Sequence, residues 1–289
     1  LGLVKADLPF RVCAVAASVL ADGRVQVEPE AGLDAAVLSI SQVAGQLADA
    51  ADRVFGAAGA VGFADAWLGT LAFSGQIFCD FAGYSTVAVG ASLCLGFALP
   101  DNFNMPYAAI GFSDFWRRWH ISLSTWLRDY LYIPLGGNRG SEARTYVNLM
   151  LTMLLGGLWH GASWTYVAWG GLHGLYLACE RWIRAKSGVA GDPAGLWNRL
   201  ALALLTYFLV NITWVFFRAE DFAGAARILQ GMFGFATEPE AVLPTVYMIK
   251  VGVIVTGIVA THWLMRKRTL EGVVSRAPWW LTGLVAAIM

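Results

Sequence analysis

The longest uncharged run in the sequence covers residues 146–179 and strongly limits what the chain can fold into. These 34 positions contain no Asp, Glu, Lys or Arg. A bilayer core accommodates about 20 apolar residues of helix, so the run is too long for one straight span. Gly156, Gly157 and Gly161 lie near its middle. The sequence therefore predicts two spans, or a broken hairpin, with the break near these glycines.

Other apolar stretches extend this pattern to most of the chain. The sequence is 57% hydrophobic and 14% charged, whereas soluble domains contain about 45–50% apolar and about 25% charged residues. We therefore predict an all-α bundle of about six to seven membrane spans with a re-entrant or broken-helix centre. The further predicted spans are residues 61–79, 84–99, 200–217, 242–265, the start of one from residue 279 and, more weakly, 8–21.

Charges between these stretches suggest an orientation, because cytoplasmic loops of membrane proteins are enriched in Lys and Arg. Residues 181–199 and 266–276 each carry four basic residues and one acidic residue, which predicts the cytoplasmic side. Residues 218–240 carry two basic and four acidic residues, and residues 21–53 carry two basic and six acidic residues. We expect both of these acidic segments on the outer side.

This orientation conflicts with the middle of the chain. Residues 114–144 contain five Arg and three acidic residues, which predicts the cytoplasmic side. Two spans after the acidic segment would instead return the chain to the outer side near residue 100. Either residues 100–135 re-enter the membrane or one predicted span is wrong. Irregular backbone at membrane depth is tolerated where protein or a water-filled cavity surrounds it, so a functional cavity is expected here.

His160 is the most distinctive polar residue, because it lies near the middle of the uncharged run. An ionisable residue at membrane depth suggests a functional site. An imidazole with an ordinary pKa near 6.5 can accept and return a proton near neutral pH. The alternative is a histidine that packs between helices and forms a hydrogen bond across the bundle. Position alone leaves both open.

A second polar segment covers residues 113–130, where Arg and Asp alternate with aromatic residues. Helical spacing allows Asp114 to pair with Arg117 or Arg118. Asp129 has no cation four residues further on, so we expect any partner to come from elsewhere. The segment is either an interfacial helix with Trp anchors and snorkelling Arg, or a cavity wall whose guanidinium groups bind the phosphates of an acyl donor such as coenzyme A.

The other histidines and the cysteines carry weaker signals. His173 lies 13 residues after His160 and need not share its helix face, so we expect a structural role. His262 lies near the end of a predicted span and is expected at the membrane interface. No metal site or disulfide framework is indicated, because no C-x-x-C pair is present. The cysteines are Cys13, Cys79, Cys94 and Cys179.

Three segments resemble the membrane-bound O-acyltransferase family, and within it the alginate O-acetyltransferase type. They are residues 113–139, which end in Leu-Tyr-Ile-Pro-Leu-Gly-Gly-Asn-Arg, residues 156–174, and residues 215–220, Val-Phe-Phe-Arg-Ala-Glu. The resemblance covers about residues 64–234 and places the family's active-site histidine at His160. The chain departs from the usual pattern at Ala82, Thr86 and Met105, where Ser, Asp and Arg are common.

The resemblance implies one membrane-embedded acyltransferase domain over residues 1–289, which lacks N-terminal spans of a longer protein. Within it, residues 113–139 would form an amphipathic or re-entrant segment and residues 146–179 the active-site tract. The catalytic candidates are His160, as general base, and His120, which could orient His160, bind the donor or pair with a carboxylate. The candidates for support or donor binding are Asp114, Trp116, Arg117, Arg118, Arg128, Asp129, Asn138 and Trp159.

The implied reaction transfers an acetyl or other acyl group from a cytoplasmic thioester, such as acetyl-coenzyme A, to a hydroxyl. The acceptor would be an exported polysaccharide or a periplasmic acetyltransferase partner. The expected location is the bacterial inner membrane, with several passes, no tightly bound cofactor and no metal. A zero net formal charge also argues against nucleic-acid binding. The alternatives are a transporter or channel with a histidine-lined path, and a non-catalytic scaffold of an export complex.

Overall fold

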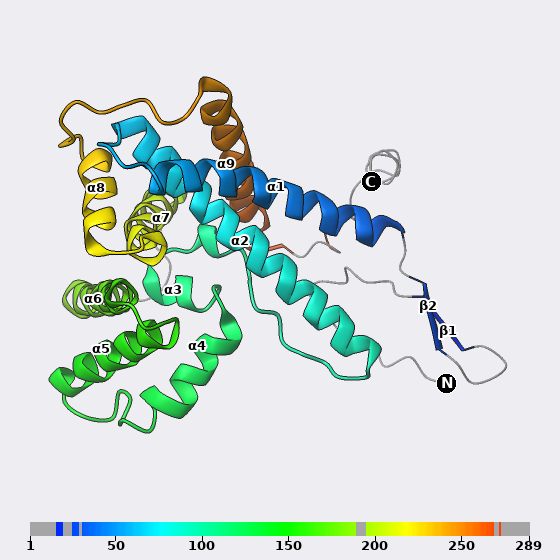
Figure 1. The fold of residues 1–289 in the computed structure, drawn as a ribbon. Helices are drawn as coiled ribbons and strands as arrows, with labels where there is room; N and C mark the ends of the chain where they lie inside the picture. The colour runs from blue at the N-terminus through cyan, green and yellow to red at the C-terminus, as the bar shows by residue number, and fades with distance from the viewer. Residues whose placement is uncertain (1–15, 20–24, 29–30, 189–194, 269–271, 273–289) are drawn as a thin grey trace.

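The structure is a computed structural model that describes residues 16–19, 25–28, 31–188, 195–268 and 272. Helices form nearly all of it, which confirms the all-α class (Figure 1). The long helices are α1 (Ala31–Phe55), α2 (Phe63–Cys94), α5 (Glu142–Trp159), α6 (Trp164–Ser187), α7 (Leu196–Arg218) and α9 (Thr245–Met265). The shorter ones are η1 (Pro106–Ala108), α3 (Phe112–Trp116), α4 (Ile121–Leu127), the π-helical η2 (Arg128–Tyr132) and α8 (Phe222–Met232).

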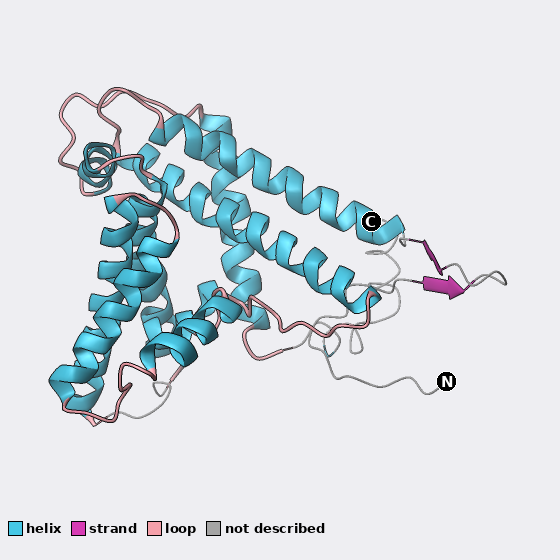
Figure 2. Ribbon diagram, turned by 60° about the horizontal axis from the view of Figure 1, so that its bottom comes forward, coloured by secondary structure: helices cyan, strands magenta, loops and turns pink. Residues whose placement is uncertain are grey.

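A small β-hairpin is the exception to the helical class. Strands β1 (Ala16–Val19) and β2 (Val25–Glu28) pair in an antiparallel manner. Figure 2 shows them at one end of the molecule, away from the helices that carry the predicted site. The weak span predicted at residues 8–21 falls mostly outside the described residues, and the span predicted from residue 279 lies wholly outside them.

Helix α2 corrects the two spans predicted at residues 61–79 and 84–99. The structure has one continuous helix of 32 residues. The polar interruption that suggested a boundary contains no proline, and Asp80 lies exposed on the helix surface. An exposed acid and a single glycine weaken a helix without ending it. One long apolar helix, and not two, therefore lies between residue 62 and residue 95.

Three of the described helices are long and apolar enough to cross a membrane: α2, α7 and α9. The last two correspond to the predicted spans at residues 200–217 and 242–265. The acidic segment before α2 also has more structure than expected, because α1 occupies residues 31–55 and packs beside α2 along its length (Figure 1).

The uncharged run forms a broken hairpin, as the sequence predicts. Helix α5 ends at Trp159 and α6 begins at Trp164, with Ser163 accepting a hydrogen bond from the Thr165 amide. The two helices approach closely, since a Cβ atom on Gly157 would collide with the carbonyl oxygen of Tyr166. A Cβ atom on Gly170 would collide in the same way with the carbonyl of Met153. These glycines permit the contact that turns the chain back at His160.

Aromatic side chains fill the space between the hairpin, α3 and α7. Trp169 and Trp214 are almost fully buried, and their rings stack at a centroid distance of 6.2 Å. Phe115 and Trp119, from the segment between η1 and α4, extend the same core. Residues 113–139 therefore do not form one continuous amphipathic helix. They form short helical pieces: α3 packs on α6 near the centre of the molecule, Trp119 packs on Trp214 of α7, and η2 packs on α5 (Figure 1).

Candidate active site

His160 directly follows the last residue of α5, at the turn of the hairpin. Its ring packs edge to face against Trp169 of α6 and Phe217 of α7, each at a centroid distance of 5.1 Å. Trp159 lies against it at the same distance. Within the described part of the chain, no hydrogen bond reaches the His160 imidazole. Among these described residues, packing alone therefore holds the ring, and neither ring nitrogen has a protein hydrogen-bond partner.

His120 is held in a different way. It precedes α4 and adopts left-handed backbone angles, with φ 45° and ψ 56°. Such angles are costly for a residue with a side chain and persist only where surrounding contacts stabilise them. Asn102 supplies these contacts: its carbonyl oxygen accepts from the Ile121 amide at 2.9 Å, and its side-chain Oδ1 lies 3.2 Å from His120 Nδ1.

The bonds around Asn102 fix the tautomer of His120. The Ser122 backbone amide, which can only donate, points to Asn102 Oδ1 at 3.1 Å, so this atom is the carboxamide oxygen and not the nitrogen. The Ser122 hydroxyl lies 2.9 Å from the same oxygen and donates to it. An oxygen next to Nδ1 requires Nδ1 to carry the proton. The neutral His120 ring therefore presents an unprotonated Nε2 as a hydrogen-bond acceptor.

Trp159 lies between the two histidines. Its ring centroid is 6.4 Å from that of His120 and 5.1 Å from that of His160. Phe81 of α2 covers His120 at 4.6 Å. Burial, and then the nearby His160, lower the pKa of His120 to about 4. Both catalytic candidates therefore lie in one half-buried aromatic site, where His120 is neutral near pH 7.

Asp114 forms a separate cluster. It accepts from the Ile110 amide at 3.0 Å, from Arg118 Nε at 2.9 Å and from Arg266 Nη2 at 2.9 Å. Burial alone would raise the pKa of Asp114, but the amide and the two guanidinium groups outweigh it and hold the pKa below its ordinary value. The predicted pairing with Arg118 is confirmed. Arg266 adds a link from α3 to the end of α9.

The other supporting candidates lie apart from the histidine pair. Asp129 pairs with its own neighbour Arg128 at 2.7 Å, so its partner does come from outside the i+4 position. Arg117 is exposed, and Trp116 packs on Trp169. Asn138 accepts from the Tyr132 hydroxyl at 2.5 Å on an exposed loop. Of the candidates, the structure brings only Trp159 to His120 and His160.

The two remaining histidines are buried. His173 Nε2 lies 3.0 Å from the Thr213 hydroxyl, and aromatic rings surround its imidazole, which agrees with a structural role. His262 was expected at the membrane interface, but it is only 3% exposed. It accepts a hydrogen bond from the Tyr107 amide at 3.2 Å and packs on Phe78. The loop after α2 folds back over the end of α9 and covers it.

Among the residues that the structure describes, no three His, Cys, Asp or Glu side chains meet in a group that could hold a metal ion. The two imidazoles of the histidine site can transfer protons and form hydrogen bonds. A neutral imidazole can take a proton from a hydroxyl and release it to a leaving group.

Sequence reasoning missed Asn102 and Phe217 as parts of the site. Asn102 lies in a loop 18 residues before His120, and no periodic pattern links the two. Phe217 belongs to the third resembling segment, whose position beside His160 becomes visible only in the fold. The left-handed angles of His120 give no sequence signal either, since glycine is the residue that usually marks them.

The sequence model of the MBOAT, membrane-bound O-acyltransferase family matches residues 61–187. A Pseudomonas aeruginosa protein named probable alginate O-acetylase AlgI is 56% identical over 173 residues, which cover 60% of this chain and 32% of that protein. A Helicobacter pylori peptidoglycan O-acetyltransferase is 44% identical over 192 residues, 66% of this chain and 36% of that protein.

A more distant relative is a Bacillus subtilis teichoic acid D-alanyltransferase, 30% identical over 161 residues that cover 52% of this chain and 40% of the relative. The chain spans about a third of the length of the alginate O-acetylases that it matches. The matched region contains α2 to α6 and both histidines of the site. Residues 61–187 belong to the membrane-bound O-acyltransferase family, and the chain is similar there to alginate O-acetylases.

Proposed function

We propose that the protein transfers an acyl group, most simply acetyl, from a thioester to a hydroxyl of a polysaccharide. The observation that carries this proposal is the pair of half-buried histidines, His120 and His160, on either side of Trp159. The relatives named above are O-acetylating or D-alanylating proteins, and their names contain alginate, peptidoglycan and teichoic acid. All of these acceptors carry hydroxyl groups.

In the proposed mechanism, His160 acts as general base. It takes the proton of the acceptor hydroxyl while the hydroxyl oxygen attacks the thioester carbonyl carbon. The carbon–sulfur bond then breaks, and the imidazolium returns the proton to the leaving thiolate. A well-placed general base contributes about 10²–10⁴-fold in rate. No described residue forms a hydrogen bond with the His160 imidazole, which supports this role, because the ring can change protonation without breaking such a bond.

We further propose that the protein is a multi-pass protein of the bacterial inner membrane. With α2 as a single crossing, the five Arg of residues 114–144 fall on the same side as the basic residues of 181–199 and 266–276. The acidic segments, residues 21–53 and 218–240, fall on the opposite side. This arrangement satisfies the enrichment of positive charge in the cytoplasm. In this proposal the acyl donor is acetyl-coenzyme A and arrives from the cytoplasm, and the polysaccharide or a periplasmic partner protein arrives from outside.

The test uses the full-length protein in cells that have no other copy. The O-acetyl content of the polymer is measured with the wild type, with His160→Ala and with Leu158→Ala, which truncates an exposed neighbour on the same helix. Membrane abundance is matched by immunoblot. We expect acetylation to disappear only in His160→Ala. Unchanged acetylation in that variant would contradict the proposal and favour a scaffold role.

A further inference from the structure

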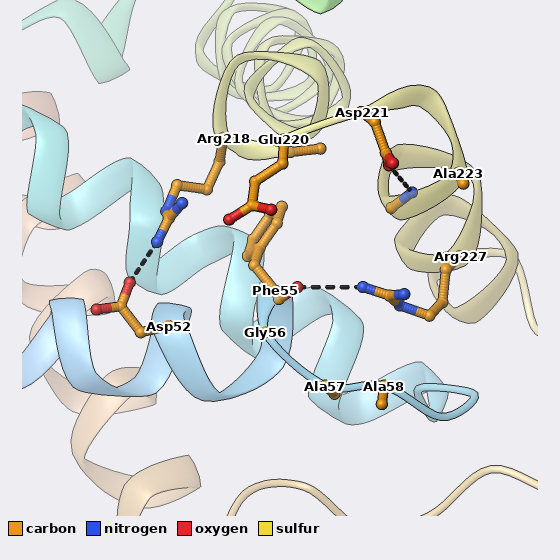
Figure 3. A pocket seen from close by; sticks show the side chains of 12 residues that line it. Asp52, Phe55, Gly56, Ala57, Ala58, Arg218, Glu220, Asp221, Ala223 and Arg227 are labelled. Carbon is orange, nitrogen blue, oxygen red and sulfur yellow. Dashed lines mark hydrogen bonds and ion pairs between the residues drawn. The ribbon is translucent and has the colours of Figure 1, made fainter.

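Two ion pairs among the described residues join parts of the chain that lie far apart in the sequence, and they differ in exposure. Arg218 of α7 pairs with Asp52 of α1, and their side chains are 32% and 60% exposed. Figure 3 shows this pair at the edge of an open surface hollow, where water screens it. Arg266, at the end of α9, pairs with Asp114 of α3, and their side chains are only 8% and 15% exposed. Charges in such a half-buried place are screened much less, so this second pair can hold α3 against the end of α9.

Asp114 binds two guanidinium groups at once. Arg118 Nε donates to Asp114 Oδ1 at 2.9 Å, and Arg266 Nη2 donates to Asp114 Oδ2 at 2.9 Å. Arg266 also donates from Nε to the carbonyl oxygen of Ala108 at 2.9 Å. The name Asp114 cluster is used below for Asp114, Arg118 and Arg266. Hydrogen bonds between charged groups are the strong ones, so the cluster fastens the segment that contains α3 to the end of α9.

Arg118 connects the Asp114 cluster with the loop that holds His120. Arg118 Nη1 donates to the carbonyl oxygen of Asn104 at 3.1 Å, and the Arg118 carbonyl oxygen accepts from the Asn104 amide at 2.9 Å. Two residues earlier in the same loop, the carbonyl oxygen of Asn102 accepts from the Ile121 amide at 2.9 Å. The backbone on both sides of His120 is therefore tied to one loop, and Arg118 joins that loop to the cluster.

The backbone of His120 depends on such anchors. Its left-handed angles are unfavourable for a residue with a side chain and persist only where the surrounding structure enforces them. If the anchors were lost, the segment would relax toward ordinary angles and turn the imidazole away from Trp159 and His160. Arg118 lies only two residues before His120, so the cluster can influence the position of the imidazole through the backbone without touching it.

We propose that the Asp114 cluster positions His120 for the reaction and makes the end of α9 part of the framework of the active site, and this rests on the proposed function. Arg118 and Arg266 are then positioning residues and not phosphate-binding residues, since their guanidinium groups already bind Asp114 and backbone carbonyl oxygens. Arg266 lies outside residues 61–187, the part of the chain that the family model matches. The proposed role therefore adds an element from beyond the matched region.

The experiment uses the full-length protein and substitutions that keep the positive charge. Arg118→Lys keeps a cation beside Asp114, but an ammonium group lacks the planar fork that bridges this carboxylate and a backbone carbonyl. Its matched control is Arg117→Lys at the adjacent, exposed arginine, whose side chain has no hydrogen bond or ion pair among the described residues. Arg266→Lys tests the end of α9, and Arg268→Lys, at an exposed arginine two residues further on, is its control.

Two properties are measured for each variant. Amide hydrogen exchange in detergent reports how firmly the loop is held, and kcat and the donor KM are measured with acetyl-coenzyme A and the de-acetylated polymer of the host cells. We expect faster exchange of the Asn104 and Ile121 amides in Arg118→Lys and Arg266→Lys. In these two variants kcat should fall by about 10- to 100-fold, the effect of a small misplacement of a catalytic group, with the donor KM unchanged. Both controls should behave like the wild type.

A double variant tests whether Arg118 acts through His120. In the Asn102→Leu background the imidazole has already lost its hydrogen bond from the loop. Arg118→Lys should therefore cause little further loss of kcat there, because substitutions in one network are not additive. If the two losses of kcat multiplied instead, Arg118 would act independently of His120, and the proposed positioning role would be wrong.

Three further results would overturn the positioning role. The first is unchanged exchange in both Arg118→Lys and Arg266→Lys. The second is a higher donor KM with unchanged kcat, which would make these residues donor-binding. The third is an equal loss of kcat in the control Arg117→Lys. None of these results affects the proposed function, which fails if His160→Ala retains transfer. The exchange measurement needs no transfer, so it tests the hold on the loop in either case.

Discussion

The two histidines of the site lie on either side of one tryptophan, yet different forces hold them. His120 is fixed by hydrogen bonds from a loop, with Asn102 determining which nitrogen carries the proton. His160 is fixed by aromatic rings from three helices and has no polar partner among the described residues. Hydrogen bonds fix the tautomer of His120, whereas aromatic packing fixes the position of the His160 ring and not its tautomer. The difference predicts that the two respond to different mutations.

The largest effect should come from the packing that places His160. Gly157→Ala would push the Cβ atom into the carbonyl of Tyr166 and force α5 and α6 apart. Overpacking of this kind costs about 1–3 kcal/mol and occasionally more. We expect loss of transfer together with a lower unfolding temperature in detergent. Gly252→Ala on α9, where a Cβ atom meets open space, is the control. Normal transfer in Gly157→Ala would show that packing does not position His160.

A smaller effect should come from the hydrogen bonds that hold His120. Asn102→Leu removes the oxygen that accepts from Nδ1 and leaves the tautomer free. We expect kcat to fall by about 10- to 100-fold, equivalent to about 1.4–2.7 kcal/mol, with little change in the KM of the donor. Ser85→Ala is the matched control, because Ser85 contacts only the amide nitrogen of Asn102. A similar loss in Ser85→Ala would mean that loop stability, and not the tautomer, matters.

The pH dependence of an Asn102→Asp variant tests whether the protonation of His120, and not the stability of the loop, matters for the reaction. The new carboxylate still accepts from His120 Nδ1, so the tautomer is kept and activity should survive. Its negative charge favours the protonated imidazole and therefore raises the pKa of His120. If the reaction needs the neutral ring, activity falls at a higher pH when the solution is acidified. The acidic limb of the pH–rate profile therefore moves to higher pH. An unmoved profile would show that the protonation of His120 does not limit the reaction.

Several features of the fold and of the candidate site can be predicted from local sequence, whereas the single helix α2 and the contacts of the site cannot. The break in residues 146–179, the helices at 200–217 and 242–265 and the Asp114–Arg118 pair rest on hydropathy and helical spacing, which are local properties. The single helix α2 was missed because a charged residue in an apolar stretch has the same sequence pattern whether it ends a helix or points outward. Only the packing beside α1 distinguishes these cases.

The contacts that define the site are tertiary. Asn102 and Phe217 come from a loop and from a helix end, 18 residues before His120 and 57 residues after His160. His262 is buried because the Tyr107 loop covers it, which hydropathy cannot show. The sequence identified His160 from its unusual place in an apolar run. It could not show that, in the part of the chain that the structure describes, His120 has a hydrogen bond and His160 has none.

A third histidine, His173, is a reference for the comparison between His120 and His160. His173 is fully buried among aromatic rings, like a more enclosed His160, but it has the Thr213 hydroxyl as a partner. Thr213→Val removes that partner at nearly constant volume and leaves a buried imidazole nitrogen unsatisfied, which costs about 1–3 kcal/mol. We expect a lower unfolding temperature with kcat retained in the folded fraction. Loss of kcat without loss of stability would assign His173 to the reaction.

The smallest effect should come from the exposed pair Arg128–Asp129. Both side chains are well exposed, at 60% and 40%, and they are adjacent in sequence. The Arg128 hydrogen bond holds the pKa of Asp129 below its ordinary value, so Arg128→Ala should raise that pKa. The stability from the pair is present above the ordinary pKa of Asp129 and is lost as the pH falls through the lowered value. Exposed pairs contribute little, so near pH 7 the unfolding temperature should change by less than about 2 °C. A large rise in the KM of the acyl donor in Arg128→Ala, with stability unchanged, would instead give this guanidinium the phosphate-binding role that the sequence suggests.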